Sequence, residues 1–203
     1  MKRSLVTTAA LAAALALSPA LALAAAEPGK PAPAFGVKDA AGKEHKLADY
    51  DGKWLVLEWF NKDCPYVKKH YGSGNMQTLQ KEVTGKDVAW LTVISSAEGK
   101  QGYLTPEQAV EVAKSSKSSA DATLLDVDGT MGKAYGAKTT PHMFLINPKG
   151  QVVYAGAIDD NDSSDPSVIP DSKNYVRTAV ESGLAGKDVE VTSSKAYGCS
   201  VKY

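Results

Sequence analysis

The chain has 203 residues and balances 23 Lys and Arg against 23 Asp and Glu, so its formal net charge at pH 7 is zero. Such a balance gives no electrostatic footprint for nucleic acid, and we expect no nucleic-acid partner. The length suits a single domain with a proper core.

Residues 1–26 predict a secretory signal peptide. Two basic residues precede an alanine- and leucine-rich run, and small residues offer cleavage options between Ala24 and Ala26. Pro19 and the weak hydrophobicity of alanine disfavour the alternative, an uncleaved anchor helix. We therefore expect residues 27–203 to be exported to the periplasm or secreted, with no membrane attachment after cleavage.

Apolar periodicity predicts the first half of the domain. Residues 39–53 carry two glycine-containing turns and follow a proline-rich entry, which indicates a hairpin. Trp54–Phe60 is a nearly continuous apolar run, typical of a strand covered on both faces. A helix should start at Pro65 and break at residues 72–74, because each of two glycines costs a helix interior about 1 kcal/mol. A second helix should follow, with Asn75 as its N-cap.

The second half alternates in the same way. Asp87–Ser96 predicts a buried strand, and Thr105, Pro106 and Gln108 form a capping-box signature at the start of a helix. Apolar strands that alternate with helices predict an α/β sandwich, with a mostly parallel sheet and a final antiparallel hairpin. The remaining predicted elements are a strand at 122–127, a short helix at 129–136, strands at 142–147 and 151–158, and a helix at 172–184.

Cys64 lies where the first buried strand runs into a helix. The positive end of a helix favours a thiolate, and Pro65 suits the first helical position. Lys62, Lys68 and Lys69 are expected to add positive charge nearby. These features predict a reactive thiol, and the alternative is an inert buried cysteine.

Glu58 is the only charged residue of the apolar run Trp54–Phe60. A carboxylate in a buried strand is costly unless it is paired or protonated. Burial would raise its pKa and let it carry protons near neutral pH. The alternative is a strand-end glutamate paired with a lysine.

The dipeptide Thr140-Pro141 directly precedes a predicted strand. Proline cannot donate a ladder hydrogen bond, so Pro141 must mark the first residue of that strand or a special turn. A cis peptide is compatible with this position.

With these residues the chain resembles thioredoxin-fold proteins of the redoxin branch. Such proteins carry a carboxylate six residues before the reactive cysteine, as Glu58 precedes Cys64, and a cis-proline loop facing it, as at Pro141. The segment DCPYVKKHYGSGNMQ and the tail YGCSVKY are similar to peroxiredoxin-like members, the alkyl hydroperoxide reductase and thiol-specific antioxidant type. The resemblance implies a thioredoxin-like three-layer α/β sandwich, with an N-terminal hairpin extension and a C-terminal tail. It also implies that Thr140 and Pro141 shape a substrate groove.

The chain departs from both branches of that family. Val67 stands where thioredoxins have a second cysteine. Leu57 and Asn61 replace the proline and the threonine or serine that peroxiredoxins carry before their cysteine. Arg177, the only arginine of residues 27–203, lies on the last predicted helix instead of in the loop of Pro141. These departures favour disulfide chemistry over a standard peroxidase site.

Cys199 is the only other cysteine of the chain. Exported compartments oxidise thiols, although counting alone does not establish a pairing. Tyr197, Val201 and Tyr203 make the surrounding tail too apolar to stay free in water. We expect the tail to fold back over the sheet and to bring Cys199 toward Cys64.

The sequence therefore predicts an exported thiol-disulfide oxidoreductase with Cys64 as the nucleophile, Cys199 as the resolving thiol and Glu58 as a proton relay. Its substrate would be a protein or small-molecule disulfide or a peroxide, an external thiol reductant would reset it, and no cofactor is expected. Four alternatives remain: a peroxiredoxin-like thiol peroxidase with the same cysteines, a permanent structural disulfide, Cys64 acting alone, and a non-catalytic metal- or partner-binding protein.

Two further patterns are weaker. His70 and His142 could form a soft-metal site with Cys64, but no spacing supports it, and we expect no metal. The acidic run Ile158–Ser167 lacks a closing glutamate for calcium and is expected to be a solvated turn.

Overall fold

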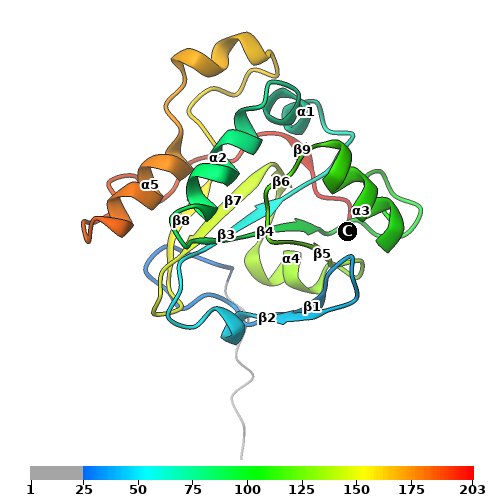
Figure 1. Ribbon diagram of the computed structural model, residues 1–203, viewed down its shortest axis with the longest axis horizontal. Helices are drawn as coiled ribbons and strands as arrows, with labels where there is room; N and C mark the ends of the chain where they lie inside the picture. The colour runs from blue at the N-terminus through cyan, green and yellow to red at the C-terminus, as the bar shows by residue number, and fades with distance from the viewer. Residues whose placement is uncertain (1–24) are drawn as a thin grey trace, which may run out of the picture.

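The computed structural model describes residues 25–203 (Figure 1). The predicted signal peptide therefore lies, up to residue 24, outside the described residues. The elements in chain order are β1 (Gly36–Lys38), β2 (Glu44–Lys46), the 3-10 helix η1 (Leu47–Tyr50), β3 (Leu55–Trp59), α1 (Pro65–Gly72), α2 (Asn75–Thr84), β4 (Ala89–Ile94), α3 (Pro106–Ser115), β5 (Ala122–Leu125), α4 (Thr130–Tyr135), β6 (Thr139–Thr140), β7 (His142–Ile146), β8 (Val152–Gly156), the 3-10 helix η2 (Pro166–Asp171), α5 (Tyr175–Leu184) and β9 (Cys199–Ser200).

A five-stranded sheet forms the middle layer, in the order β5-β4-β3-β7-β8. β3 pairs in parallel with β4, and β4 with β5, whereas β7 runs antiparallel to both β3 and β8. Four strands therefore share one direction, and the predicted final hairpin is β7-β8. All five residues of β3 are buried, as expected for a strand covered on both faces.

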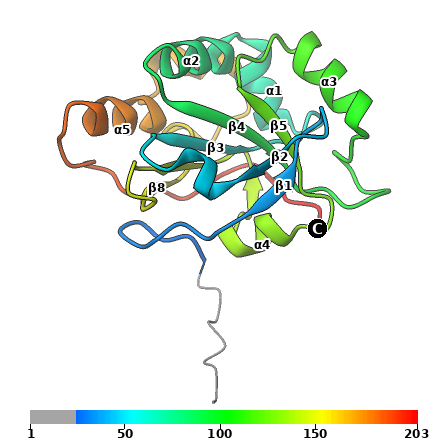
Figure 2. The same cartoon turned by 60° about the horizontal axis from the view of Figure 1, so that its bottom comes forward.

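Helices cover both faces of this sheet (Figure 2). α1, α2, α3 and α5 lie on one side of the sheet, and α4 and the β1-β2 hairpin lie on the other. Alternate residues of β3 feed the two sides: Leu57 packs with Phe144 and Tyr135 toward α4, and Val56 packs with Leu79 toward α2. This confirms the three-layer α/β sandwich with an N-terminal hairpin. Within residues 25–203, no helix is both long and apolar enough to cross a bilayer.

Local signals set most helix boundaries. Thr105 and Gln108 form the predicted capping box, with reciprocal bonds of 2.9 and 3.3 Å. α1 and α2 are separate helices, as the two glycines predicted. The N-cap prediction for Asn75 is wrong, because Gly74 takes that position in a left-handed conformation with φ of 79°. The Asn75 side chain instead lies 2.8 Å from Nδ1 of His70.

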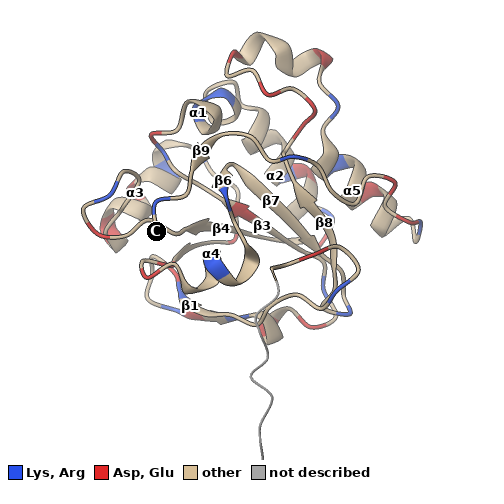
Figure 3. Cartoon of the chain, turned by 180° about the vertical axis from the view of Figure 1, so that it is seen from behind, with Lys and Arg blue, Asp and Glu red and all other residues tan. Residues whose placement is uncertain are grey.

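The C-terminal tail is tied down along its whole course, as the predicted fold-back requires. It passes the end of α1 and reaches β6, as seen from behind the molecule (Figure 3). There β9 pairs antiparallel with β6, so that Cys199 lies opposite Thr140. Beyond β9, the N–H of Val201 donates to the Lys138 carbonyl at 3.1 Å, and the N–H of Ala97 donates to the Lys202 carbonyl at 2.9 Å.

Gly198 gives a test of this docking. Its φ is 130°, and a Cβ at this position would collide with the carbonyl oxygen of Thr140. We expect Gly198→Ala to destabilise the docked tail by about 1–3 kcal/mol through collision and backbone strain. The measurements are the urea midpoint of unfolding and the rate at which a protease trims the tail.

Gly186→Ala is the matched control. Gly186 also has a positive φ, 67°, but no heavy atom lies within 4 Å of the added methyl group. It should lose about 1 kcal/mol for the left-handed conformation alone and keep the tail resistant to protease. Equal trimming of the two variants would contradict a tail that is held at Gly198.

Candidate functional site: a pair of thiols at the start of α1

Cys64 occupies the junction that the sequence predicts. β3 ends at Trp59, a short turn follows, and Cys64 is the N-cap residue of α1 with Pro65 as the first helical residue. The N–H of Cys64 donates to the Asn61 carbonyl at 3.1 Å, which closes the turn. The Cys64 side chain is fully buried, and its Sγ donates to the Thr140 carbonyl at 3.0 Å. The thiol therefore sits between its own helix and the loop of Pro141.

Thr140 and Pro141 form the wall opposite the thiol. The peptide between them is cis, which the sequence allowed. Thr140 is buried, and its hydroxyl lies 3.5 Å from the carbonyl oxygen of Cys199. The tail thus covers this wall, and the docked tail fills the position where the resemblance places a substrate groove.

Cys199 packs against the apolar cluster that contains Cys64, and its strand partner Thr140 supplies the carbonyl that accepts the Cys64 thiol. Both cysteines are free thiols, Cys64 buried and Cys199 half-buried. The structure therefore brings together two residues that are far apart in the sequence.

The two thiols differ in acidity. Burial alone would raise the pKa of Cys64, but hydrogen bonds from the Cys199 thiol and from the N–H of Val67 outweigh it, and the net pKa lies below its usual range. Burial and the neighbouring Cys64 raise the pKa of Cys199 to about 11. The thiolate form therefore concentrates on Cys64, and Cys199 keeps its proton.

Two of the three lysines predicted to assist Cys64, Lys62 and Lys69, have other partners. Lys62 pairs with the adjacent Asp63 at 2.8 Å. Lys69 is buried and its Nζ donates to the Asn161 carbonyl at 2.8 Å, on the side of α1 that faces the loop after β8. The hydrogen bonds of Cys199 and Val67, and not lysine charges, account for the acidity of Cys64.

Glu58, the fourth of the five residues of β3, is completely buried. Its carboxylate accepts hydrogen bonds from neutral groups: Trp90 Nε1 at 2.9 Å, the Tyr71 hydroxyl at 2.9 Å and Gln80 Nε2 at 3.1 Å, with Thr92 Oγ1 at 3.5 Å. Burial raises the pKa of Glu58 to about 7, although these donors act in the opposite direction. These neutral donors take the place of the lysine partner considered as an alternative.

Glu58 and Cys64 are linked only indirectly. Cys64 is not among the hydrogen-bond partners of Glu58, whereas Tyr71 bonds Glu58 and packs against the apolar cluster that contains Cys64. The Tyr71 hydroxyl donates to Glu58, and its ring packs edge-on against Phe60, beside Cys64, with ring centroids 5.2 Å apart. The structure places a titratable carboxyl near the site, and the proton-relay role stays a prediction.

A buried polar cluster beside the thiols was missed by the sequence analysis. It joins Lys69 and His70 of α1, Asp159 after β8, and Tyr197 of the tail. Asp159 is 2% exposed, so the prediction that the acidic run is a solvated turn is wrong at its first aspartate. Paired lysine and histidine inside an amphipathic helix were the available signal, because a buried charge needs a partner.

The histidines do not gather around Cys64. His70 contacts Tyr197 and Asn75, whereas Nδ1 of His142 lies 3.3 Å from the N–H of Lys138. In the described part of the chain, no group of three or more His, Cys, Asp or Glu side chains is placed to hold a metal ion.

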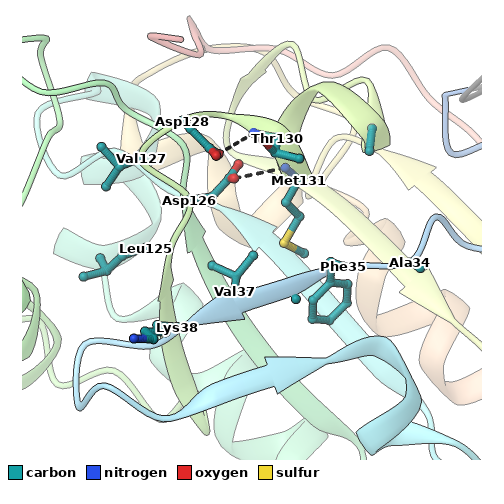
Figure 4. A pocket seen from close by; sticks show the side chains of 12 residues that line it. Ala34, Phe35, Val37, Lys38, Leu125, Asp126, Val127, Asp128, Thr130 and Met131 are labelled. Atoms are coloured by element: carbon teal, nitrogen blue, oxygen red, sulfur yellow. Dashed lines mark hydrogen bonds between the residues drawn. The ribbon is translucent and has the colours of Figure 1, made fainter.

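A pocket of about 670 Å³ lies on the opposite side of the sheet, between β1 and α4 (Figure 4). Asp126 lines it and accepts the N–H groups of Met131 at 3.0 Å and Gly132 at 2.8 Å. Neither cysteine lines this pocket, so it is separate from the thiol pair.

The raised pKa of Glu58 gives a pH-dependent stability test. The folded chain holds this proton up to a pH of about 7, whereas the unfolded chain releases it near 4.5. Glu58 therefore makes the folded state lose stability as pH rises through this window, by on the order of 3 kcal/mol. We expect Glu58→Gln to remove that dependence, measured by urea unfolding at pH 5 and pH 8.

The free energy of unfolding must be compared between wild type and Glu58→Gln at each pH, because other groups also titrate in this range. Burial lowers the pKa of His70 and of His142 to about 4, so both histidines increase folded-state stability as pH rises from about 4 to 6.5. This opposite trend is common to wild type and variant. The advantage of wild type over Glu58→Gln should be larger at pH 5 than at pH 8, and an equal difference at the two pH values would argue against a titrating Glu58.

The thiol pair gives a second test. Because the Cys199 thiol stabilises the Cys64 thiolate, Cys199→Ala should raise the pKa of Cys64, and Cys199→Ser, which keeps a donor, should raise it less. The measurement is the absorbance of the thiolate at about 240 nm as a function of pH. A Cys64 pKa unchanged by Cys199→Ala would exclude this hydrogen bond as a source of the acidity.

Comparisons with known proteins address the family and the fold of the chain. Residues 28–155 match the AhpC/TSA family. A hypothetical protein of Sinorhizobium meliloti 1021 is 25% identical with a TM-score of 0.74, over 89% of this chain and 96% of that one. An uncharacterized conserved protein of Geobacillus kaustophilus is 24% identical with a TM-score of 0.72, over 87% and 92%.

A putative thiol:disulfide interchange protein DsbE of Chlorobium tepidum is 22% identical with a TM-score of 0.51, over 64% of this chain and 85% of that one. No curated protein matches the chain. The structural similarities establish the thioredoxin-like fold that the sequence predicts. The family match spans more than half of the 203 residues, and the chain belongs to the AhpC/TSA family.

Proposed function

We propose that this protein is an exported thiol-dependent oxidoreductase that acts by thiol-disulfide exchange through Cys64, with Cys199 as the resolving thiol. Membership of the AhpC/TSA family supports oxidoreductase activity in general. The observation that carries the finer proposal is the pairing of β9 with β6, which puts Cys199 opposite Thr140, the residue whose carbonyl accepts the Cys64 thiol at 3.0 Å. The lowered pKa of Cys64 and the pKa of Cys199, raised to about 11, agree with it.

In the first step the Cys64 thiolate attacks one sulfur of a substrate disulfide. The substrate S–S bond breaks, a mixed disulfide forms on Cys64, and the leaving thiolate takes up a proton. The thiolate is the attacking form, and the hydrogen bond from the N–H of Val67 in the first turn of α1 still favours it when the tail leaves and the hydrogen bond from Cys199 is lost. The reacting sulfur lies against the Thr140 carbonyl, at the first turn of α1.

In the second step Cys199 loses its proton and attacks the Cys64 sulfur of the mixed disulfide. The second substrate thiol leaves, and the protein retains a Cys64–Cys199 disulfide, having donated two electrons. An external thiol reductant then returns both cysteines to thiols. The docked tail supports this step, since it keeps the resolving sulfur beside Cys64 instead of leaving it to diffuse.

The tail must also move during the cycle. Cys64 is 0% exposed when β9 is paired with β6, so a substrate disulfide has no access to its sulfur. The first step therefore uses an undocked tail, and the second step uses a docked one. Glu58, protonated about half of the time near pH 7, is the candidate proton store for these transfers, acting through an intermediary because it does not contact Cys64.

A thiol peroxidase is the second candidate, and the AhpC/TSA match favours it. Here the Cys64 thiolate would attack a hydroperoxide, break its O–O bond and release an alcohol or water, leaving a sulfenic acid. Cys199 would condense with it to the same disulfide and release water. The replacement of the peroxiredoxin positions by Leu57 and Asn61, stated above, argues for disulfide exchange as the main activity.

Export is proposed from residues 1–26 and a domain over 27–203. Cleavage after Ala24 would keep Ala26, whose side chain is buried against the core on the α4 side of the sheet. An exported thiol enzyme needs a local electron donor, which favours the periplasm. The expected partners are accordingly a disulfide substrate and a thiol reductant.

The test combines mass spectrometry with turnover. Oxidation of the purified chain by one equivalent of a small disulfide should join Cys64 to Cys199, and a mild thiol should part them. Cys64→Ser should abolish reduction of a disulfide substrate, whereas Cys199→Ser should accumulate the mixed disulfide on Cys64. A hydroperoxide assay with the same variants decides between the two chemistries.

The outcomes are distinct. Faster steady-state consumption of hydroperoxide than of disulfide, lost in Cys64→Ser, would reverse the proposed order of activities. A Cys64–Cys199 disulfide that resists every thiol reductant would make the pair a structural link and overturn the redox cycle.

A further inference from the structure

The buried cluster beside the thiols connects the two segments that carry them, α1 and the C-terminal tail. Lys69 and His70 lie on α1, five and six residues after Cys64, and both are buried. Tyr197 lies two residues before Cys199 in the tail. Asp159, after β8, contacts all three: its carboxylate accepts the Tyr197 hydroxyl and lies 3.6 Å from Lys69 Nζ and 3.8 Å from His70 Nε2.

The hydrogen bonds of this cluster run in one direction. The Asn75 side-chain amide lies 2.8 Å from Nδ1 of His70, which makes Nδ1 the acceptor and leaves the proton on Nε2. Nε2 is 3.1 Å from the Tyr197 oxygen and donates to it. The Tyr197 hydroxyl in turn donates to Asp159. Burial lowers the pKa of His70 to about 4, which is consistent with this neutral ring.

The Tyr197 ring is held as well as its hydroxyl. Lys69 Nζ lies 5.3 Å from the ring centroid, and the Tyr66 ring packs at a centroid distance of 5.6 Å. If the tail left, Asp159 would lose the Tyr197 donor, and Lys69 would lose the ring over its ammonium group. Hydrogen bonds to a buried charged group are among the stronger ones, so this contact opposes undocking.

The segment from Tyr197 to Cys199 is short and closely packed, so fixing Tyr197 also restricts the position of Cys199. Gly198 packs against the Thr140 backbone so closely that no side chain fits, and Cys199 then pairs with Thr140. Fixing Tyr197 on one side and the β6 pairing on the other therefore leaves the Cys199 sulfur little room to move.

We propose that Tyr197 is a positioning residue that holds Cys199 against Cys64, through its hydroxyl bond to Asp159 and its packing on Lys69. This inference rests on the proposed resolving role of Cys199. Tyr197 does not touch the reacting sulfurs. It sets the equilibrium between a docked tail, in which Cys199 can close the disulfide, and an undocked tail, in which an outside molecule reaches Cys64.

One equilibrium then governs two measurable quantities in opposite directions. A weaker hold lowers the effective concentration of Cys199 at Cys64, because the second thiol is beside the first for less of the time. The same weaker hold exposes Cys64, and its alkylation becomes faster.

The test uses Tyr197→Phe in the whole exported chain, which removes the hydroxyl and keeps the ring. The effective concentration is obtained from the equilibrium with reduced and oxidised glutathione. The alkylation rate of Cys64 by iodoacetamide is measured in a Cys199→Ser background and corrected for the thiolate fraction. We expect the effective concentration to fall roughly ten-fold and alkylation to rise by a similar factor.

Tyr135→Phe is the matched control. Tyr135 is also a buried tyrosine, and its hydroxyl donates to the Pro33 carbonyl at 2.9 Å on the other side of the sheet. It should lower the unfolding midpoint and leave both thiol quantities within about two-fold of wild type, because distant sites are independent.

Each remaining outcome decides something. Wild-type values for both quantities in Tyr197→Phe would overturn the positioning role, as would equal changes in Tyr197→Phe and Tyr135→Phe, which would indicate general loss of stability. If wild type never forms the Cys64–Cys199 disulfide in any glutathione mixture, the resolving role fails. The alkylation rates then still report whether Tyr197 holds the tail.

Discussion

The antiparallel pairing of β9 with β6 is the contact on which the rest of the site depends. It puts Cys199 opposite Thr140, whose carbonyl accepts the Cys64 thiol at 3.0 Å, so one short ladder fixes the relation of both sulfurs. A register shift of one residue would turn the Cys199 side chain to the other face of the strand. Gly198 protects the register, because its close approach to Thr140 fits only a residue without a side chain.

That geometry gives Cys64 and Cys199, two chemically identical side chains, different acidities. Cys64 accepts hydrogen bonds at the start of α1, which favour its thiolate. Cys199 donates a hydrogen bond to Cys64, and the negative charge on the Cys64 thiolate disfavours a second thiolate on Cys199. The pKa values therefore move apart, which supports the proposed order of reaction, in which the more acidic thiol attacks first and the other resolves. An adjacent cysteine at Val67 is unnecessary when the tail supplies the second sulfur across the fold.

Two buried carboxyl groups near the thiols differ in character because their partners differ. Glu58 is surrounded by neutral donors, so burial raises its pKa to about 7 and it can gain or lose a proton under physiological conditions. Asp159 faces Lys69 and the Tyr197 hydroxyl, which makes it the anchor that ties α1 to the tail. One carboxyl group is suited to store a proton, and the other is suited to hold a segment in position.

Features that follow from local rules are predictable from the sequence: the buried strand before Cys64, the helix that begins at Pro65, the break at residues 72–74 and the capping box at Thr105. Their causes, apolar periodicity, glycine cost and side-chain capping, act within a few residues. Three contacts become visible only in the folded chain: Lys69 faces Asp159, the Asn75 amide lies at His70, and the Tyr197 hydroxyl donates to Asp159. Contacts of this second kind join residues that are mostly far apart along the chain, and buried charges choose their partners from whatever the completed fold brings within reach.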